Sequence, residues 1–219
     1  MEMKKELKKT LTLTTIITLL PILVGLIYWN QLPEKMAIHF DMEGTPNGWS
    51  SKWFAVIGLP AILAVVNALC TVLTETDPRR YKYPEKMMKL VYWICPVVSW
   101  FCARITISYG LGNELVAMPK MASLFLGILF VIIGNYLPKV KQNYYMGIKL
   151  PWTYSDEENW NRTHRMAGKL WVAGGIVLLL NFFLGIRGLE IAVLIIMVVV
   201  PTVYSWAFSR KKDKEKMEE

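Results

Sequence analysis

Residues Ile191 to Val200 read IAVLIIMVVV, a run of apolar side chains with no polar face. A helix that is apolar all round is either buried in a large protein or surrounded by lipid. The chain has only 219 residues, of which 54% are hydrophobic and 19% are charged, so a soluble core could not hide this run and others like it. The run therefore predicts a membrane-spanning helix.

Five further stretches have the same character, and each is close to the ~20 residues that a spanning helix needs. The six predicted spans are Leu11–Tyr28, Trp53–Leu73, Leu90–Leu111, Met121–Tyr136, Leu170–Leu184 and Leu189–Phe208. The predicted fold class is therefore an all-α integral membrane protein with six transmembrane helices. Two polar stretches, residues 30–52 and 137–169, are long enough to carry function.

The lysines and arginines are distributed unevenly between the two sides of these spans. With the N-terminus in the cytoplasm, 20 of the 25 basic residues fall on the inner side. The outer ones are Lys35, Lys52, Lys120 and Arg187, and Arg104 lies within a span. By the positive-inside rule we expect a multi-pass plasma-membrane protein with both termini cytoplasmic, residues 30–52 extracellular and residues 137–169 cytoplasmic. The net charge of +8 then reflects topology, and we expect no direct contact with nucleic acid.

The outer segment contains a strand pattern followed by a turn pattern. The alternation of Met36, Ile38 and Phe40 predicts a short strand, and Gly44–Gly48 predicts a turn before the chain re-enters the membrane. His39 could contact a ligand, or it could only form a hydrogen bond that holds the turn. The candidate ligand-facing residues of this segment are His39, Phe40, Asp41, Glu43, Asn47 and Trp49.

The inner segment reads GNYLPKVKQNYYMGIKLPWTYSDEENWNRTHRMAGK from Gly134 to Lys169. Ser155 followed by Glu158 predicts a capping box, so a helix should begin near Asp156 and run into the fifth span. On that helix, one stripe at helical spacing comprises Trp160, Thr163, His164, Ala167, Gly168 and Trp171. We predict one ordered unit, whose candidate residues are Asn135, Pro138, Lys139, Asn143, Gly147, Lys149, Pro151, Trp152, Trp160, Thr163, His164 and Arg165. The basic tail from Arg210 predicts a solvated, frayed end of the last helix.

Arg104 is the one charge that lies clearly inside a predicted span, roughly 9 Å below the outer interface at ~1.5 Å per residue. An intramembrane charge is costly and usually has a use, so Arg104 is also a candidate ligand-facing residue. Snorkelling, or pairing with Asn181, Glu190 or Glu114, would explain it without a ligand. Asn67, in the second span, predicts a hydrogen bond between helices.

We predict neither a metal site nor a cofactor. His39 and His164 are the two histidines of the chain, and in the expected topology they lie on opposite sides of the membrane, where they cannot share a metal ion. The three cysteines all lie within predicted spans and show no CxxC spacing, so no disulfide framework is expected.

The two polar segments resemble those of a known family. The pattern Leu32-Pro33, His39-Phe40, Gly44, Pro46, Trp49 and Lys52 resembles the domain of unknown function DUF1648 that begins SdpI-type proteins. The pattern from Gly134 to Gly168 resembles the SdpI signature itself. Lys149 and Leu150 depart from it, since arginine and threonine are expected there. The resemblance divides the chain into a DUF1648-like region, residues 1–75, and an SdpI-type region, residues 76–219.

The resemblance implies a bacterial immunity protein that protects the cell against a secreted toxin peptide. It also implies signal transduction, because the founding member holds a transcriptional repressor at the membrane. The expected partners are then the lipid bilayer, a toxin peptide outside and a repressor inside. Two other classes stay open, a small transporter or exporter and a membrane enzyme. Only Arg104 offers the transporter a charge within the membrane, and the acids near His164 are more simply explained by helix capping, so we expect a binding protein and not an enzyme.

Overall fold

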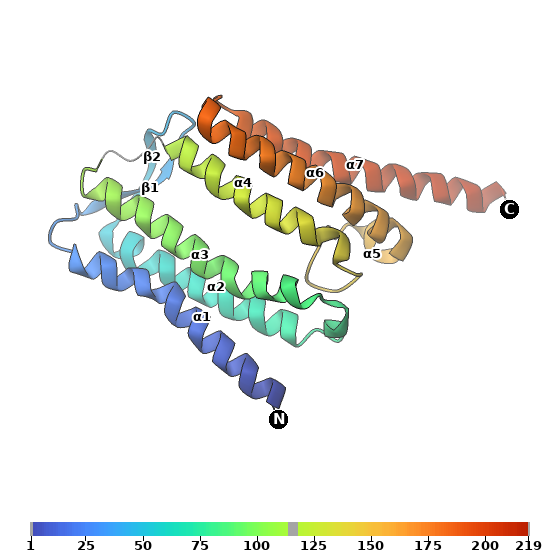
Figure 1. Cartoon of the computed structure of the whole chain (residues 1–219), viewed down its shortest axis with the longest axis horizontal. Helices are drawn as coiled ribbons and strands as arrows, with labels where there is room; N and C mark the ends of the chain where they lie inside the picture. Colours follow the sequence, from blue (N-terminus) through green and yellow to red (C-terminus); the bar gives the residue numbers. More distant parts are fainter. Residues whose placement is uncertain (1, 114–117, 219) are drawn as a thin grey trace. The chain divides into compact units, whose positions relative to one another are not determined.

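The computed structural model describes residues 2–113 and 118–218, which form two compact units. The first unit comprises Met1–Thr76 and Met88–Met118, and the second comprises Asp77–Met87 and Pro119–Glu219. Within the described residues, six helices are long and apolar enough to cross a membrane, which confirms the predicted fold class (Figure 1). The division into sequence regions 1–75 and 76–219 stays a prediction.

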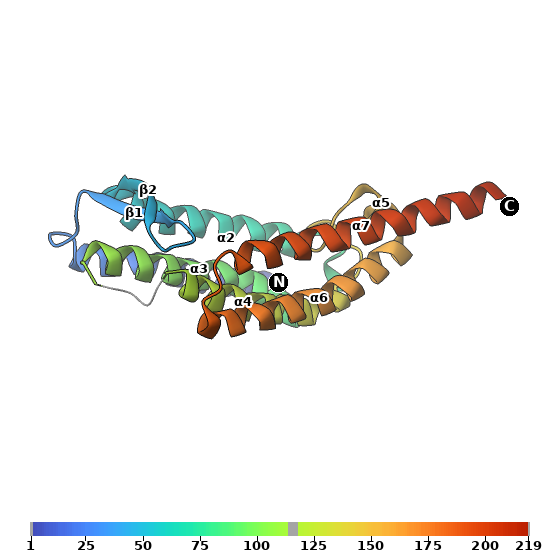
Figure 2. The same cartoon turned by 90° about the horizontal axis from the view of Figure 1, so that it is seen from above.

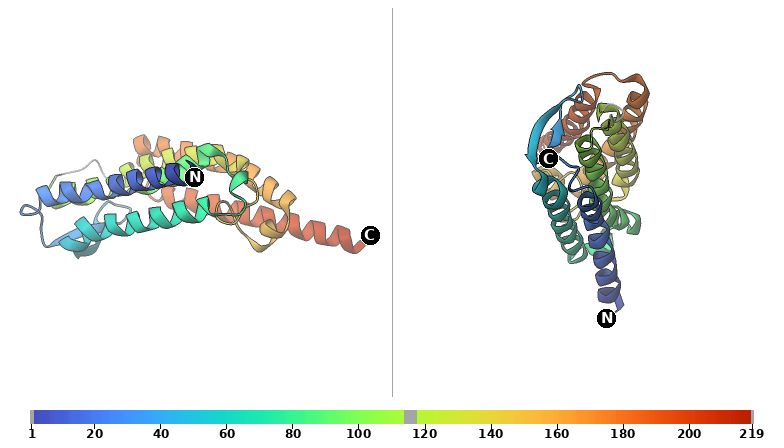
Figure 3. Two further views of the ribbon diagram at one scale, coloured as in Figure 1. Left: turned by 90° about the horizontal axis from the view of Figure 1, so that it is seen from below. Right: turned by 90° about the vertical axis from the view of Figure 1, so that its left-hand side faces the viewer.

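The first unit is built from α1 (Glu2–Ile27), α2 (Leu59–Glu75) and most of α3 (Glu85–Gly110). Helices α1 and α2 lie side by side (Figure 3). A π-helical turn, η1 (Phe54–Gly58), precedes α2. The predicted spans coincide with these helices, although α1 begins well before Leu11, because its basic first turns continue the helix beyond the apolar part.

A buried hydrogen bond joins α1 to α2. Asn67 Nδ2 donates to Thr14 Oγ1 over 2.9 Å, and both residues are fully buried. The Ser99 hydroxyl of α3 also bonds to α1, donating to the Thr18 carbonyl over 2.8 Å. A bond of this kind between helices in lipid contributes ~0.6 to 2 kcal/mol. The prediction for Asn67 is confirmed.

The chain between α1 and η1 forms an antiparallel hairpin of β1 (Lys35–Phe40) and β2 (Pro46–Ser51). The predicted strand is confirmed, but the predicted turn is wrong, because Pro46–Gly48 belong to β2. The turn lies at residues 41–45, where the Asp41 carboxylate accepts the N–H groups of Glu43 at 3.0 Å and Thr45 at 2.8 Å. An aspartate side chain that accepts hydrogen bonds from the backbone N–H groups of the following residues can stabilise a turn without glycine at its first positions.

The second unit contains α4 (Met118–Tyr136), the short helices η2 (Arg80–Lys82), η3 (Leu137–Lys139) and α5 (Pro151–Ser155), and the long helices α6 (Glu157–Leu184) and α7 (Leu189–Glu218). Helix α6 ends at Gly185, whose positive φ of 66° gives the left-handed C-cap that glycine adopts most easily. Helices α6 and α7 run side by side, and α7 continues past the start of α6 (Figure 2).

Helices α4 and α6 meet through glycines. A Cβ atom on Gly127 would lie 2.9 Å from the Gly175 carbonyl oxygen, and one on Gly134 would lie 2.9 Å from the Gly168 carbonyl oxygen. Both pairs are one heptad apart, and the order along α6 is the reverse of that along α4, as antiparallel packing requires. Small residues at such positions let two backbones approach closely in lipid. The two helices therefore touch backbone to backbone.

Two predictions about helix ends are wrong. The N-cap of α6 is Asp156 and not Ser155, because Asp156 Oδ1 accepts the N–H groups of Glu158 at 2.9 Å and Asn159 at 3.4 Å, while Ser155 ends α5. Helix α7 does not fray at Arg210 but continues to Glu218. Lys212 holds it in place, since its Nζ lies 2.7 Å from Asp156 Oδ2 and 3.1 Å from Glu158 Oε2.

Candidate functional site

Asn143 organises the loop between η3 and α5 from inside. Its side chain is fully buried, and Oδ1 accepts the N–H groups of Tyr145 at 2.9 Å and Met146 at 2.7 Å. The Tyr83 hydroxyl oxygen lies 3.0 Å from the same oxygen. The amide nitrogen donates to the carbonyls of Lys141 and Met146 at 2.8 and 2.9 Å. Every donor and acceptor of this amide is used, so Asn143 specifies the path of the loop.

Asp77 ties residues 77–87 to the same loop. It is buried, and its carboxylate accepts the N–H groups of Arg79 and Tyr144 and the hydroxyl of Tyr83. Burial and the hydrogen bond to Asp77 raise the pKa of Tyr83, so the phenol stays protonated and remains a donor. Sequence reasoning missed Asp77 and Tyr83, because they meet Asn143 and Tyr144 only after 60 or more residues of chain.

His164 and Trp160 close the loop onto α6. The N–H of Ile148 donates to His164 Nε2 over 2.9 Å, and His164 Nδ1 lies 2.8 Å from the Trp160 carbonyl oxygen. One ring nitrogen therefore accepts while the other faces an acceptor, which fits the neutral tautomer with its proton on Nδ1. Trp160 stacks on the imidazole with centroids 4.2 Å apart and donates from Nε1 to the Val140 carbonyl over 2.8 Å.

Gly147 makes this closure possible. Its φ of +113° is a conformation that residues with a Cβ rarely adopt. A Cβ atom there would lie 2.3 Å from His164 Nε2 and 2.8 Å from the Trp160 ring. The position therefore requires glycine for its backbone angle and for its lack of a side chain.

Side chains of α5 and α6 fasten this region to α7 through Ser205. Trp152 Nε1 donates to Ser205 Oγ over 2.7 Å, and Asn159 Nδ2 donates to the Ser205 carbonyl over 2.9 Å. The Thr163 hydroxyl then donates to Asn159 Oδ1 over 3.0 Å. Within α5, Thr153 is buried and donates to the Ile148 carbonyl over 2.8 Å. Trp152 is thus a bridge between helices.

The predicted residues of this segment, residues 134–169, which we call the signature segment, fall into two groups. Asn143, Trp160, Thr163 and His164 are fully buried, and Trp152 is half-buried. The exposed ones are Asn135, Pro138, Lys139, Gly147, Lys149, Pro151 and Arg165. The first group determines the fold and cannot meet a partner directly. Contact with a partner is open only to the second group and to neighbouring surface residues.

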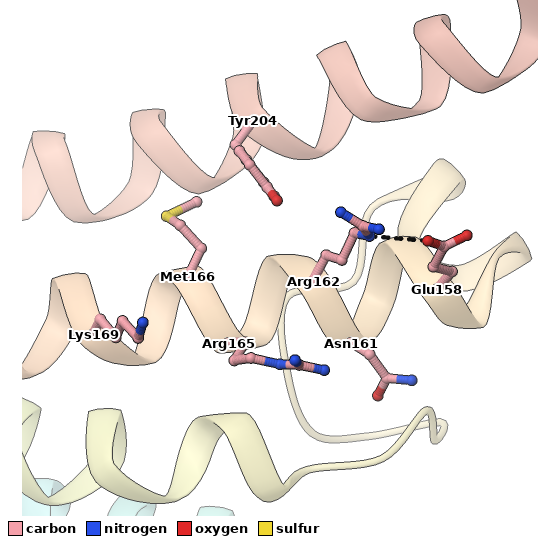
Figure 4. Close-up of a pocket in the computed structure, with 7 residues that line it drawn as sticks. All are labelled: Glu158, Asn161, Arg162, Arg165, Met166, Lys169 and Tyr204. Carbon is pink, nitrogen blue, oxygen red and sulfur yellow. Dashed lines mark hydrogen bonds and ion pairs between the residues drawn. The ribbon is translucent and has the colours of Figure 1, made fainter.

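A groove of about 740 Å³ runs along the exposed face of α6, and we call it the α6 groove. Its lining residues are Glu158, Asn161, Arg162, Arg165, Met166 and Lys169 of α6 and Tyr204 of α7 (Figure 4). Arg162 Nε forms an ion pair with Glu158 over 2.9 Å. Of these residues, Arg165 was among the candidate residues predicted from the sequence. A spacing of three or four residues between its cations was the available signal.

Residues 30–52, which we call the hairpin segment, present a different set of side chains. His39, Glu43, Asn47 and Trp49 are exposed, while Phe40 and Asp41 are half-buried. His39 Nδ1 lies 2.5 Å from Asn47 Oδ1, so this pair links the two strands. The rings of Phe40 and Trp49 both approach Tyr109 of α3, with centroid distances of 5.3 and 6.5 Å. These ring contacts pack the hairpin against α3.

Lys52 anchors the base of the hairpin segment. It is 6% exposed, and its Nζ lies 2.8 Å from Glu34 Oε1. The same nitrogen donates to the carbonyls of Trp29 and Leu32 at 3.3 and 3.2 Å, just after the end of α1. Its place in the DUF1648-like pattern was the one sequence signal for this residue. Because lysine is almost never buried without partners, these contacts explain why a cation stands here.

Arg104 lines a cavity of about 330 Å³ between α1 and α3, together with Tyr28 and Trp100. It forms no ion pair with any residue that the structure describes. Asn181 and Glu190, two of the partners considered from the sequence, bond to each other in the second unit over 2.9 Å, and Glu114 lies outside the described residues. No group of three or more metal-binding side chains occurs within residues 2–113 and 118–218.

The helices and the buried signature segment together define a multi-pass integral membrane protein. The sequence model of the SdpI/YfhL protein family matches residues 139–205, and that of DUF1648, a domain of unknown function, matches residues 16–64. The chain is 27% identical to the Immunity protein SdpI of Bacillus subtilis (strain 168) over 202 residues. This alignment covers 91% of the present chain and 95% of that protein. No solved structure matches the chain. The predicted resemblance is confirmed, because the SdpI/YfhL match, the DUF1648 match and the similarity to the Immunity protein SdpI all fall on this chain.

Proposed function

We propose that this protein is a membrane immunity protein that protects a bacterial cell against a secreted toxin peptide by binding and not by catalysis. The observation that carries the proposal is its similarity to the Immunity protein SdpI, which extends over 91% of the chain and includes both matched segments. The test is survival. Cells without an SdpI-type gene should resist the killing peptide of an SdpI-type system when they express this protein, and unchanged killing at verified expression would contradict the proposal.

In the proposed topology, both termini lie in the cytoplasm and the hairpin segment lies outside. The distribution of lysine and arginine supports it, with 20 of the 25 on the inner side. In a variant whose own cysteines have been replaced, Asn47→Cys should react with an impermeant maleimide in intact cells. The exposed residue Lys149, as Lys149→Cys, should react only after permeabilisation. The opposite pattern would overturn the topology.

We further propose that the hairpin segment and the signature segment serve different partners. The hairpin segment would meet the toxin with the exposed His39, Glu43, Asn47 and Trp49 and the half-buried Phe40 and Asp41. Arg104 would belong to the same surface. The signature segment would meet a cytoplasmic repressor through its exposed residues, Arg165 among them. A secreted peptide arrives from outside and a DNA-binding protein from inside, so one surface cannot serve both.

Three variants at matched expression test this division: Asp41→Ala, Arg104→Ala and Arg165→Ala. Toxin survival and recruitment of the repressor to the membrane are measured for each. The proposal predicts that Asp41→Ala and Arg104→Ala lower survival, whereas Arg165→Ala lowers recruitment and leaves survival intact. Equal loss of both activities in every variant would contradict the division and point to a common loss of folded protein.

A further inference from the structure

We propose that the α6 groove binds the phosphate of an anionic phospholipid headgroup. The groove brings Arg162, Arg165 and Lys169 from three successive turns of α6 to one face, with Tyr204 reaching toward that helix from α7 (Figure 4). Guanidinium groups suit phosphate because they donate several hydrogen bonds in a fixed plane, and a lysine adds a compact charge. This site goes beyond the proposed function and shares Arg165 with the surface proposed for the repressor.

The charges in the groove do not cancel one another. Glu158 is the one acid of the lining, and it is already engaged by Arg162 at 2.9 Å and by Lys212 at 3.1 Å. Arg165 and Lys169 are exposed, and neither forms an ion pair with a residue of the described chain. The groove therefore keeps positive charge that an anion can neutralise.

The groove lies where α6 changes from polar to apolar. The lining residues end at Lys169, and the following turns carry exposed Ile176, Val177 and Leu180. On α7, Trp206 is 49% exposed close to Tyr204, and aromatic residues of this kind favour the level of the headgroups. Cations next to such a boundary meet lipid phosphates first, whichever side of the membrane they face.

The size and lining of the groove also favour a lipid over an acidic protein segment. About 740 Å³ is ample for a headgroup, and Met166 provides an apolar surface among the cations. By helical spacing, the exposed Ile176 and Leu180 follow on the same side of α6 as the groove, where acyl chains would cover them in a membrane. A phospholipid satisfies both the charged and the apolar part, whereas a soluble acidic segment would satisfy only the first.

The test compares lipid binding in the intact protein. Purified wild-type protein in nanodiscs is titrated with phosphatidylglycerol in a phosphatidylcholine background, and bound lipid is counted by native mass spectrometry. The double variant Arg165→Gln with Lys169→Gln should bind phosphatidylglycerol about thirtyfold more weakly, since each cation near an anionic surface contributes ~1 kcal/mol. Both residues are exposed, so the variant should keep its thermal stability.

A matched control removes two charges elsewhere, at the exposed residues Lys214 and Lys216 near the end of α7. Lys214→Gln with Lys216→Gln should retain at least half of the wild-type affinity. If the control loses as much as the groove variant, net charge and not the groove governs binding, and the proposal is wrong. The proposal is also wrong if phosphatidylcholine binds as tightly as phosphatidylglycerol. It is wrong as well if millimolar inorganic phosphate displaces the lipid, which would indicate a site for a free ion, or if the groove binds an acidic peptide and no lipid.

Discussion

The hairpin segment and the signature segment use their distinctive residues in opposite ways. In the hairpin segment, the predicted ligand-facing residues are mostly exposed, and the buried anchor is Lys52, which was not among them. In the signature segment, the predicted residues Asn143, Trp160 and His164 are fully buried and bonded to one another or to backbone. A motif that identifies a family thus need not be the surface that acts. In this protein the buried residues of the motif form a framework, while its exposed residues, such as Lys149 and Arg165, lie on the surface.

The sharpest test of that framework is Gly147→Ala. Its φ of +113° and the 2.3 Å approach to His164 Nε2 leave no room for a Cβ atom. Backbone strain together with overpacking should cost ~4 kcal/mol, enough to lose most folded protein. Fluorescence-detected size-exclusion chromatography after heating measures this. Gly112→Ala is the matched control, because φ is also positive, at +75°, but nothing lies within 4 Å. Equal losses in both would show that packing at Gly147 is unimportant.

Asn143→Ala should have the next largest effect. It removes an amide that satisfies two backbone N–H groups and two carbonyls. Leaving such buried groups unpaired should cost ~3 kcal/mol, measured by thermal unfolding in detergent. Asn143→Asp keeps the acceptor oxygen but puts a second oxygen against the carbonyls of Lys141 and Met146, so it should lose stability too. A neutral result for Asn143→Ala would mean that the loop is held by other contacts.

In the hairpin segment, Lys52→Met should cost ~1 to 2 kcal/mol, less than the changes in the signature segment. The substitution keeps the apolar stem but removes the donor to the carbonyls of Trp29 and Leu32. Glu34→Gln should cost below ~1 kcal/mol, because the Glu34 side chain is 85% exposed and a surface pair contributes little. Limited proteolysis at the hairpin reports local opening. If Glu34→Gln opens the hairpin as much as Lys52→Met, the ion pair and not the carbonyl contacts is the anchor.

The smallest expected effect concerns pH and Asp156. Burial opposes its charged form, but Lys212 and the N–H groups of Glu158 and Asn159 outweigh burial and lower the pKa of Asp156. A carboxyl with a lowered pKa stabilises the folded state above its ordinary pKa, and this contribution disappears as pH falls through the lowered value. When the pH is lowered from 6 to 3, the Tm of wild type should fall by about 2 °C more than the Tm of Asp156→Asn. The difference is small because solvent screens a partly exposed ion pair.

Asparagine is also a good N-cap, so Asp156→Asn isolates the charge from the cap. Asp213→Asn, at an exposed site on α7, should leave the pH dependence of wild type unchanged. If Asp156→Asn and wild type lose the same Tm between these pH values, the pair with Lys212 makes no contribution to stability.

The helices could be predicted because the bilayer imposes one length and one composition on every span. The stripe of Trp160, Thr163 and His164 could be predicted because helical spacing alone puts those residues on one face. The second strand could not be predicted, because Pro46, Asn47 and Gly48 are residue types common in turns. The hydrogen bonds of Asp41 determine where the chain reverses. Contacts such as Asp77 with Tyr144 and Lys212 with Asp156 join residues more than 50 positions apart, and no local pattern encodes them.

The burial of the signature residues also could not be anticipated from their types. Tryptophan, histidine and asparagine are common in binding sites, yet here His164 accepts a backbone N–H and Trp160 donates to a backbone carbonyl. The same types of side chain bind partners when they are exposed and stabilise the fold when they are buried. In this chain, these two backbone hydrogen bonds and the close approach of Gly147 to His164 Nε2 give the side chains the second role.

The glycine contacts between α4 and α6 have a mechanical consequence. Gly127 faces Gly175 and Gly134 faces Gly168, so the two helices fit together at one setting only. A slide by one turn would place Trp171 or Leu179 where Gly175 now lies, and the backbone of α4 could no longer approach α6 so closely. The two helices are therefore locked in register. The Trp171 indole and the Asn159 amide of α6, each bonded to an α7 carbonyl, tie α7 to this locked pair.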